Sequence, residues 1–450
     1  MNALAPVNLT QLIDERPIGR MQIATFLLCA SVAFLDGLDS QSIAIAAPFI
    51  VRELHLDKSH LGFVFSAGVF GAVLSAMLLG TLADRIGRKK VLMGSVVLFG
   101  IGTFATAYAP SYAALLMLRV LSGIGLGGAV PCFLALASEY SPRRRRAAIA
   151  SLLWAAFPLG GMVGGFSNAL LIRYFDWHSI FIVGGTLPIL LVVVIARALP
   201  ESARFLLQRD ASQAAFSRLV ARLDLPVGAR YVVDDVQTHG VPLRRIFAEG
   251  RALPTLLLSL AFLMAFATLA VAVLWTPVLL RAQGMSAANA AVAIGFHGLG
   301  ALIGMAIVGR LIERFGGARV LVPALILGAI ATAATGQVGG SLVAASIALA
   351  LIGVFVGLGA SGAIALAVLF FPAEIRSTGV GWSMGVGRLG QVIAPIAIGS
   401  LVQHDLTAGQ VMFVVGLAPA IAAMAIAAMR FSHPISAGEI DATEGDLVHH

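Results

Sequence analysis

Long apolar segments alternate with short polar loops along almost the whole chain. A helix needs about 20 consecutive apolar residues to cross the hydrocarbon core of a bilayer, and twelve segments of the chain meet that requirement. The pattern therefore predicts an all-α integral membrane protein with twelve transmembrane helices. The predicted spans are residues 21–51, 60–83, 90–109, 112–139, 147–171, 178–198, 253–280, 287–312, 319–337, 342–370, 378–403 and 410–431.

A long polar stretch divides these spans into two sets of six. We expect residues 1–198 to form an N-terminal six-helix bundle and residues 253–431 to form a C-terminal one. The linker between them, residues 199–252, is rich in Arg and predicts short amphipathic helices in the cytoplasm. The tail, residues 432–450, is acidic and short, so we expect it to be a disordered cytoplasmic segment.

The composition excludes other classes of protein. Hydrophobic residues make up 59% of the chain and charged residues only 12%, whereas soluble proteins carry about 25% charged residues. The two cysteines, Cys29 and Cys132, lie in apolar segments, so we expect no disulfide framework. The sequence shows no phosphate-binding loop, metal-ligand cluster or nucleophile elbow. We therefore expect neither an enzyme nor a bound cofactor or metal ion.

Basic residues are distributed unevenly between the two sides of the predicted membrane. The chain has 30 Lys and Arg residues and a formal net charge of +8, and most of these residues lie in the loops on the N-terminal side. The opposite side carries only Arg52, Lys58, Arg173 and Arg281. Because cytoplasmic loops collect Lys and Arg, both termini are predicted to lie in the cytoplasm. The positive charge therefore reflects topology and does not indicate a nucleic-acid partner.

Two carboxylates lie within the first predicted span. Asp36 and Asp39 are three residues apart, so they share a helix face and can interact. A carboxylate in the hydrocarbon core is rare and indicates a functional site. Burial and mutual repulsion both favour its protonated form. The pair therefore predicts proton-coupled transport in which one or both aspartates bind the proton.

The two halves of the chain repeat one segment on the predicted cytoplasmic side. Residues 80–92 precede the third span and residues 309–321 precede the ninth, and six of the thirteen positions are identical. A second similarity relates Glu139, after the fourth span, to Glu374, after the tenth. These repeats predict two parallel halves of six helices each, an arrangement found in secondary transporters.

The first repeated segment resembles the most characteristic motif of the major facilitator superfamily, through Gly80, Asp84, Arg85, Gly87 and Arg88. The resemblance implies the fold of that superfamily and a loop that latches the cytoplasmic ends of the two halves through breakable polar contacts. The alternative is a basic loop that only determines topology. The predicted gating residues of both halves are Asp84, Arg85, Arg88, Glu139, Glu313, Arg314, Glu374 and Arg376.

Two further segments resemble the aromatic acid/proton symporters of that superfamily. Residues 36–39 are similar to their first-span motif, and residues 375–395 are similar to their eleventh span. The resemblance implies a monomeric importer of benzoate, hydroxybenzoate or a similar acid in the bacterial inner membrane, serving the catabolism of aromatic compounds. Carriers of muconate or nicotinate share much of this pattern. A sugar carrier, a drug exporter and a membrane sensor without transport activity are further alternatives.

Arg388 is the main candidate for binding the substrate carboxylate. It lies about eleven residues into its predicted span, which is ~16 Å along the helix axis and near the midplane of the bilayer. Its planar guanidinium binds a carboxylate through two hydrogen bonds, a geometry that lysine does not reproduce. The alternative is a permanent ion pair with an aspartate of the first span.

Five further residues in the spans are candidates for the site. Arg119 can pair with either aspartate, guide the anion inward or stabilise the bundle. His297 can hydrogen-bond a substrate or a neighbouring helix, and Gln391 and Trp382 can add polar and ring contacts. Glu139 is either a gate residue paired with a loop arginine or a proton-transfer group.

These assignments combine into one expected transport cycle. External protons bind Asp36 or Asp39, and the substrate carboxylate then meets Arg388. The loaded carrier rocks to face the cytoplasm, and the halves close again through the loops that carry Asp84 and Glu313. The expected partners are thus protons, a small aromatic carboxylate and the lipid bilayer.

Overall fold

The computed structural model describes residues 7–208, 213–223, 231–232, 243–372 and 374–432. Its long helices follow the predicted spans, and their ends lie within a few residues of the predicted ends. Within these described ranges, eleven helices are long and apolar enough to cross a membrane, and the bent helix α3 makes the number twelve when it is counted as one span. The predicted all-α membrane architecture is confirmed.

The membrane helices of the first half are α2 (Arg20–Glu53), α3 (His60–Ile86), α4 (Arg88–Thr106), α5 (Tyr112–Glu139), α6 (Arg146–Tyr174) and α7 (His178–Ala198). The helices of the second half are α10 (Ala252–Leu274), α11 (Thr276–Ala282), α12 (Ala287–Phe315), α13 (Gly317–Thr335), α14 (Leu342–Phe370), α15 (Arg376–Gln403) and α16 (Ala408–Ser432).

The seventh predicted span, residues 253–280, is interrupted in the structure. Helix α10 ends at Leu274, and the short helix α11 begins at Thr276. Pro277 lies in the first turn of α11, where its missing N–H removes no hydrogen bond from the helix. The segment is apolar throughout, so hydrophobicity alone did not reveal the interruption.

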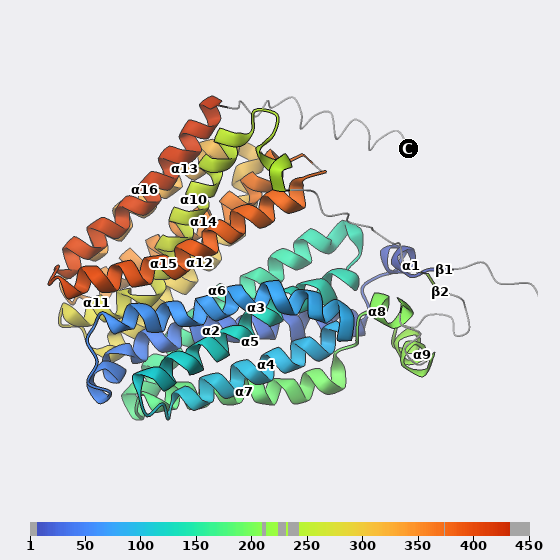
Figure 1. The fold of residues 1–450 in the computed structure, drawn as a ribbon, viewed down its shortest axis with the longest axis horizontal. Helices are drawn as coiled ribbons and strands as arrows, with labels where there is room; N and C mark the ends of the chain where they lie inside the picture. The colour runs from blue at the N-terminus through green and yellow to red at the C-terminus, as the bar shows by residue number, and fades with distance from the viewer. Residues whose placement is uncertain (1–6, 209–212, 224–230, 233–242, 373, 433–450) are drawn as a thin grey trace, which may run out of the picture.

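The helices form two bundles that lie against each other, α2 to α7 in one and α10 to α16 in the other (Figure 1). Helix α6 packs on α12, and α3 packs on α15, across the boundary between the bundles. A Cβ atom on Gly165 of α6 would lie 2.5 Å from the Cα atom of Gly295 of α12. Glycines at this crossing therefore allow the two bundles to approach closely.

The N-terminal segment and the linker form a small cap on one end of the first bundle. The cap contains α1 (Leu9–Glu15), α8 (Ala203–Gln208) and α9 (Gln213–Arg222), which gather together in Figure 1. Strand β1 (Val7–Asn8) pairs in parallel with β2 (Tyr231–Val232) of the linker. We call this end of the molecule the inner side, because the sequence predicts that it faces the cytoplasm.

Helix α1 is an element that the hydrophobic pattern did not predict. Asn8 caps it by accepting hydrogen bonds from the backbone N–H groups of Thr10 (2.9 Å) and Gln11 (3.3 Å). Leu9 and Ile13 then anchor the helix, because both side chains are buried in the core of the first bundle. Of the predicted disordered tail, Ser432 ends helix α16, and residues 433–450 lie outside the described part of the chain.

The two bundles are joined in their outer halves. The Ser66 hydroxyl of α3 donates a hydrogen bond of 2.6 Å to the Val392 carbonyl of α15. Arg281 of α11 lies over the ring of Phe49 of α2, with 4.9 Å between its guanidinium carbon and the ring centroid. Toward the inner side the bundles diverge (Figure 1). The bundles are therefore in contact in their outer halves and lie apart toward the inner side (Figure 1).

Candidate functional site

A buried ion pair lies inside the first bundle. Arg119 Nη2 of α5 donates to Asp39 Oδ2 of α2 at 3.0 Å, and Thr103 Oγ1 of α4 donates to Asp39 Oδ1 at 3.1 Å. Asp39 is 1% exposed and Arg119 is 5% exposed. Loss of either partner leaves an uncompensated charge in apolar surroundings. Together with Thr103, the ion pair connects helices α2, α4 and α5. Of the roles considered for Arg119, the structure shows pairing with an aspartate.

Asp36 has a different partner from Asp39. It is half-buried on α2, and it lies close enough to Arg388 of α15 for the two charges to interact. Among the residues that the structure describes, no ion pair joins these two groups. The two aspartates thus share a helix face, yet Asp39 is held within its own bundle while Asp36 faces an arginine of the other bundle.

Two glycines beside Arg388 bring α15 close to α10. Gly390 packs on the backbone of Leu263, and a Cβ atom on Gly387 would lie 3.2 Å from the ring of Phe266. The Phe266 ring stacks on that of Phe262, with 5.8 Å between the ring centroids. The helix that carries the arginine therefore lies against an aromatic surface.

The other predicted binding residues lie in different surroundings. His297 of α12 is 3% exposed, and its Nε2 atom has no hydrogen-bond partner in the described part of the chain. Trp382 Nε1 donates to Ser259 Oγ at 3.1 Å, and the indole packs edge-on against Phe247 of the linker. Gln391 is half-buried, about one turn beyond the arginine on α15. Trp382 thus ties the inner part of α15 to α10 and the linker.

Sequence reasoning missed Thr103 and Phe266. A threonine within a helix usually returns its hydroxyl to the backbone of the preceding turn, so the sequence did not indicate that Thr103 binds Asp39. Phe266 is one of 25 phenylalanines. Only the packing of α10 on α15 distinguishes it from the others.

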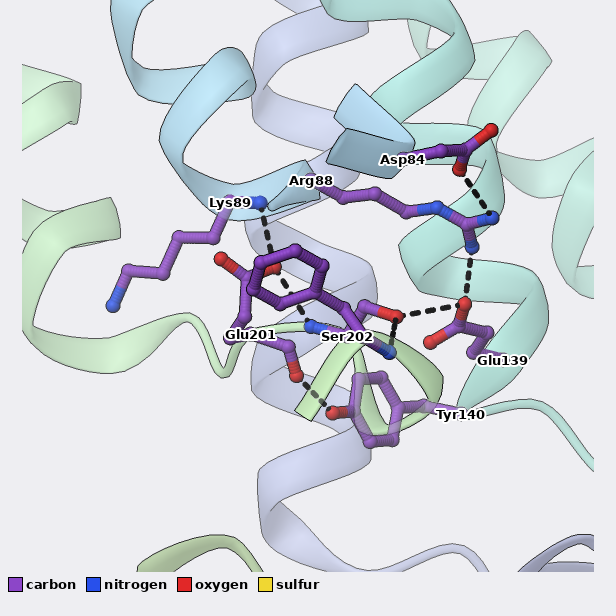
Figure 2. A network of polar contacts seen from close by, with 8 residues as sticks. Asp84, Arg88, Lys89, Glu139, Tyr140, Glu201 and Ser202 are labelled. Carbon is purple, nitrogen blue, oxygen red and sulfur yellow. Dashed lines mark hydrogen bonds and ion pairs between the residues drawn. The ribbon is translucent and has the colours of Figure 1, made fainter. Parts of the chain in front are cut away.

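A polar network connects the inner ends of the first bundle (Figure 2). Arg88, at the start of α4, forms ion pairs with Glu139 and with Asp84, the latter at 3.2 Å. Ser202 Oγ donates a second hydrogen bond to Glu139 Oε1, at 3.0 Å. The structure thus shows Glu139 paired with a loop arginine. All these residues belong to the first bundle or to the start of the linker.

Glu201 extends this network to the linker (Figure 2). Its carboxylate accepts hydrogen bonds from the backbone N–H groups of Lys89 and Ser202, each at 2.9 Å. Its backbone carbonyl accepts a hydrogen bond of 2.5 Å from the Tyr140 hydroxyl. Burial raises the pKa of the Tyr140 phenol well above its ordinary value, so the hydroxyl remains a donor. The linker is thereby fixed to the first bundle.

The predicted gating residues of the second bundle are exposed: Glu313, Arg314, Glu374 and Arg376. Arg376 Nε donates to the Phe371 carbonyl at 3.2 Å, and Arg314 lies over the ring of its neighbour Phe315. Within the described ranges, none of the four forms an ion pair with the first bundle. Arg85 of the first bundle is exposed as well. The structure therefore does not bring the two predicted gating sets together.

Two parallel bundles with a charged site between them are the architecture of a secondary transporter. A family model described as "Major Facilitator Superfamily" matches residues 29–344 and 257–446. The chain belongs to the major facilitator superfamily. Solved structures of transporters share this fold. The xylose transporter XylE from E. coli, in a partially occluded inward open conformation, superimposes with a TM-score of 0.72 at 17% identity, covering 90% of this chain and 97% of that chain.

Similar proteins within the superfamily are named as transporters of aromatic acids. The gallate transporter of Pseudomonas putida is 34% identical over 430 residues, which cover 94% of this chain and 95% of that protein. The 4-hydroxybenzoate transporter PcaK of Pseudomonas putida is 34% identical over 391 residues, which cover 85% and 86%. The predicted resemblance is confirmed. This chain is a multi-pass membrane transporter of the major facilitator superfamily and not an enzyme.

Proposed function

We propose that this transporter imports an aromatic carboxylate together with protons, at a site between its two bundles. The proposal is carried by one observation, the electrostatic interaction between Asp36 of the first bundle and Arg388 of the second. Each residue lies near the middle of its membrane helix, and each comes from a different bundle. A ligand bound between them contacts both moving parts of the carrier.

Charge balance supports coupling to protons. Without substrate, the carboxylate of Asp36 offsets the guanidinium of Arg388. A substrate carboxylate on the arginine adds a second negative charge, and two carboxylates in one site do not both stay ionised at low cost. A proton on Asp36 removes the excess charge. One proton per monoanion then makes the cycle electroneutral, whereas a larger number makes it sensitive to the membrane potential.

The two aspartates have separate roles in this proposal. Asp36 binds and releases the coupling proton, because it faces the arginine that the substrate occupies. Asp39 is a positioning residue, because Arg119 and Thr103 already hold both of its oxygens.

An aromatic acid is the substrate class that we favour. The names of the relatives, gallate and 4-hydroxybenzoate transporters, both denote a ring with a carboxylate. The ring of Phe266, which is half-buried beside Gly387 on the helix of Arg388, offers an apolar surface for such a ring. Muconate and nicotinate are the alternatives, and a panel of these acids in one competition assay distinguishes them.

We further propose that both termini face the cytoplasm of a bacterial inner membrane. The inner side collects basic residues such as Arg143, Arg144 and Arg145 in the turn directly before α6, as cytoplasmic loops do. The site is built from one chain, so a monomer suffices for transport. The inner network around Arg88 and the exposed acidic residues of the second bundle, including Glu313, are proposed to meet when the inner side closes.

Transport by purified protein in liposomes tests the proposal. An inward proton gradient should drive accumulation of labelled 4-hydroxybenzoate by the unmodified chain. Asp36→Asn should abolish accumulation but retain exchange of internal for external substrate, because Asn mimics the protonated carboxyl. Asp57→Asn, which changes an exposed carboxylate in an outer loop, is the matched control. Accumulation by Asp36→Asn at the rate of the control would refute the coupling assignment.

The same assay tests the role of Arg388. Arg388→Lys retains the positive charge but loses the bidentate hydrogen bonding to a carboxylate. The KM of this variant should therefore rise about 10-fold or more. An unchanged KM would refute the carboxylate-binding role without touching the assignment of Asp36.

A further inference from the structure

A cleft with a volume of about 230 Å³ lies at the inner side of the first bundle, away from the site between the bundles. Residues 15–18 of the N-terminal segment form one wall, and Pro142, Arg144 and Arg145 form the other. The first wall contributes Arg16 and Glu15, so the cleft holds three guanidinium groups and one carboxylate. Its net charge is therefore positive.

The two arginines of the second wall are available to a ligand. Arg144 and Arg145 are exposed, and they form no ion pair with the residues that the structure describes. The adjacent Arg143 differs, because its backbone N–H donates to Asp14 Oδ1 at 2.6 Å and its Nε lies 3.4 Å from Asp14 Oδ2. Asp14 thus fixes the loop to α1 without neutralising the two arginines that line the cleft.

The cleft lies where the first bundle enters the membrane. Helix α2 begins at Arg20, two residues after the first wall ends at Ile18, and α6 begins at Arg146, directly after the second wall. Ile18, Pro17 and Pro142 give the cleft an apolar edge beside its arginines. A guanidinium pair next to an apolar edge at this depth matches a phosphate group attached to a lipid.

We propose that this cleft binds the phosphate-ester headgroup of an anionic phospholipid from the inner leaflet. The headgroup phosphate contacts Arg144 and Arg145 from the loop before α6 and Arg16 from the segment before α2. The bound lipid joins two segments that are far apart in the sequence. It thereby stabilises the inner end of the first bundle, to which the linker is also attached through the pairing of β1 with β2. The proposal does not depend on the identity of the transported substrate.

Thermal unfolding of the purified full chain in detergent tests this site. Phosphatidylglycerol should raise the Tm more than phosphatidylcholine does at the same concentration. Arg144→Gln combined with Arg145→Gln should weaken the apparent affinity for phosphatidylglycerol roughly 30-fold, since each arginine near anionic lipid contributes about a fivefold effect. Arg244→Gln combined with Arg245→Gln is the matched control, because it removes another adjacent pair of exposed arginines on the inner side.

Several outcomes would overturn the proposal. An equal loss of phosphatidylglycerol response in both double variants would show a nonspecific attraction of lipid to basic loops. A full Tm shift with glycerol 1-phosphate alone would identify a soluble phosphate ester as the ligand in place of a lipid. If Arg144→Gln combined with Arg145→Gln unfolds without lipid, a second variant, Arg144→Lys combined with Arg145→Lys, is used instead. Native mass spectrometry then measures how much phosphatidylglycerol this variant retains. Stronger retention of phosphatidylglycerol by this charge-preserving variant than by Arg144→Gln alone supports the site, whereas equal or weaker retention refutes it.

Discussion

Helix α3 ends at Gly87 with φ 108°, and helix α12 ends at Gly316 with φ 84°. Both copies of the repeated segment therefore turn from one membrane helix into the next at a glycine in the left-handed region. The following residue is Arg88 in the first copy and Gly317 in the second. The backbone turn is shared between the halves, and the side chain that follows it is not.

This one position decides whether the inner loop is cross-linked. Arg88 reaches both Asp84 and Glu139, and so connects the ends of α3 and α5. The second copy retains acidic residues at the matching places, Glu313 and Glu374, but has no side chain at Gly317 to join them. The turn is thus the same in both halves, while the ion pairs beside it depend on a single guanidinium.

The membrane interior shows the same difference between the bundles. The first bundle pairs Arg119 with Asp39 inside itself. The second bundle carries Arg388 without an ion pair in its described residues, facing Asp36 of the first bundle. The ion pair within the first bundle fixes its helices to one another. The guanidinium of Arg388 is free of such a pair among the described residues, so it can interact with substrate and with the first bundle.

The largest effect should come from breaking the internal pair of the first bundle. Asp39→Asn leaves Arg119 buried without its counter-charge, so it should destabilise the protein by about 3–5 kcal/mol. Asp36→Asn should have a much smaller effect on stability, because Asp36 is half-buried and forms no ion pair among the described residues. Thermal unfolding of both variants in detergent measures the difference. Equal loss of Tm would contradict the separate roles of the two aspartates.

A medium effect should follow from making the first copy resemble the second. Arg88→Gly removes the contacts to Asp84 and Glu139, and should cost about 1–2 kcal/mol because both contacts are partly solvent-exposed. Lys90→Gly is the control for the effect of glycine itself, since Lys90 is exposed in the same first turn of α4. A matching loss in the control would assign the cost to the backbone rather than to the network.

A small gain should result from the reverse change. Gly317→Arg places an arginine four residues after Glu313, as Arg88 stands to Asp84. An exposed pair at this spacing stabilises by about 0.3–0.5 kcal/mol. The added side chain requires a small shift of Leu366, whose Cδ1 would lie 3.0 Å from the new Cβ. Adding Glu313→Gln should lower the stability of Gly317→Arg by this amount, because it removes the pair. Unchanged stability would exclude the ion pair as a contributor.

The smallest effect should be that of Glu374→Gln. The side chain is exposed, so the free energy of unfolding should change by less than about 0.5 kcal/mol. Glu139→Gln, at the related position of the first half, should lower stability more because it weakens the contact with Arg88. Unfolding measured side by side provides the comparison. A larger loss for Glu374→Gln would mean that the second inner loop has contacts comparable to those of the first.

Much of the fold was predictable because its cause is local. Each membrane span must be apolar along its whole length, and the repeat at residues 80–92 and 309–321 relates the two halves. The interruption before Thr276 was not predictable from hydrophobicity, since apolar residues continue on both sides. Helix α1 was also missed, because its apolar face is short and is recognised only through its burial of Leu9 and Ile13.

The sequence by itself determined which charged residues enter the membrane. A charge within an apolar span is visible without a structure, and Asp36, Asp39, Arg119 and Arg388 were all found in this way. Only the tertiary structure decided how they pair, because two aspartates about one helix turn apart can face two different helices. It placed Asp39 against Arg119 at 3.0 Å and left Asp36 facing Arg388. The pairing of these charges depends on which helices become neighbours. That is determined by packing between segments that lie far apart in the sequence.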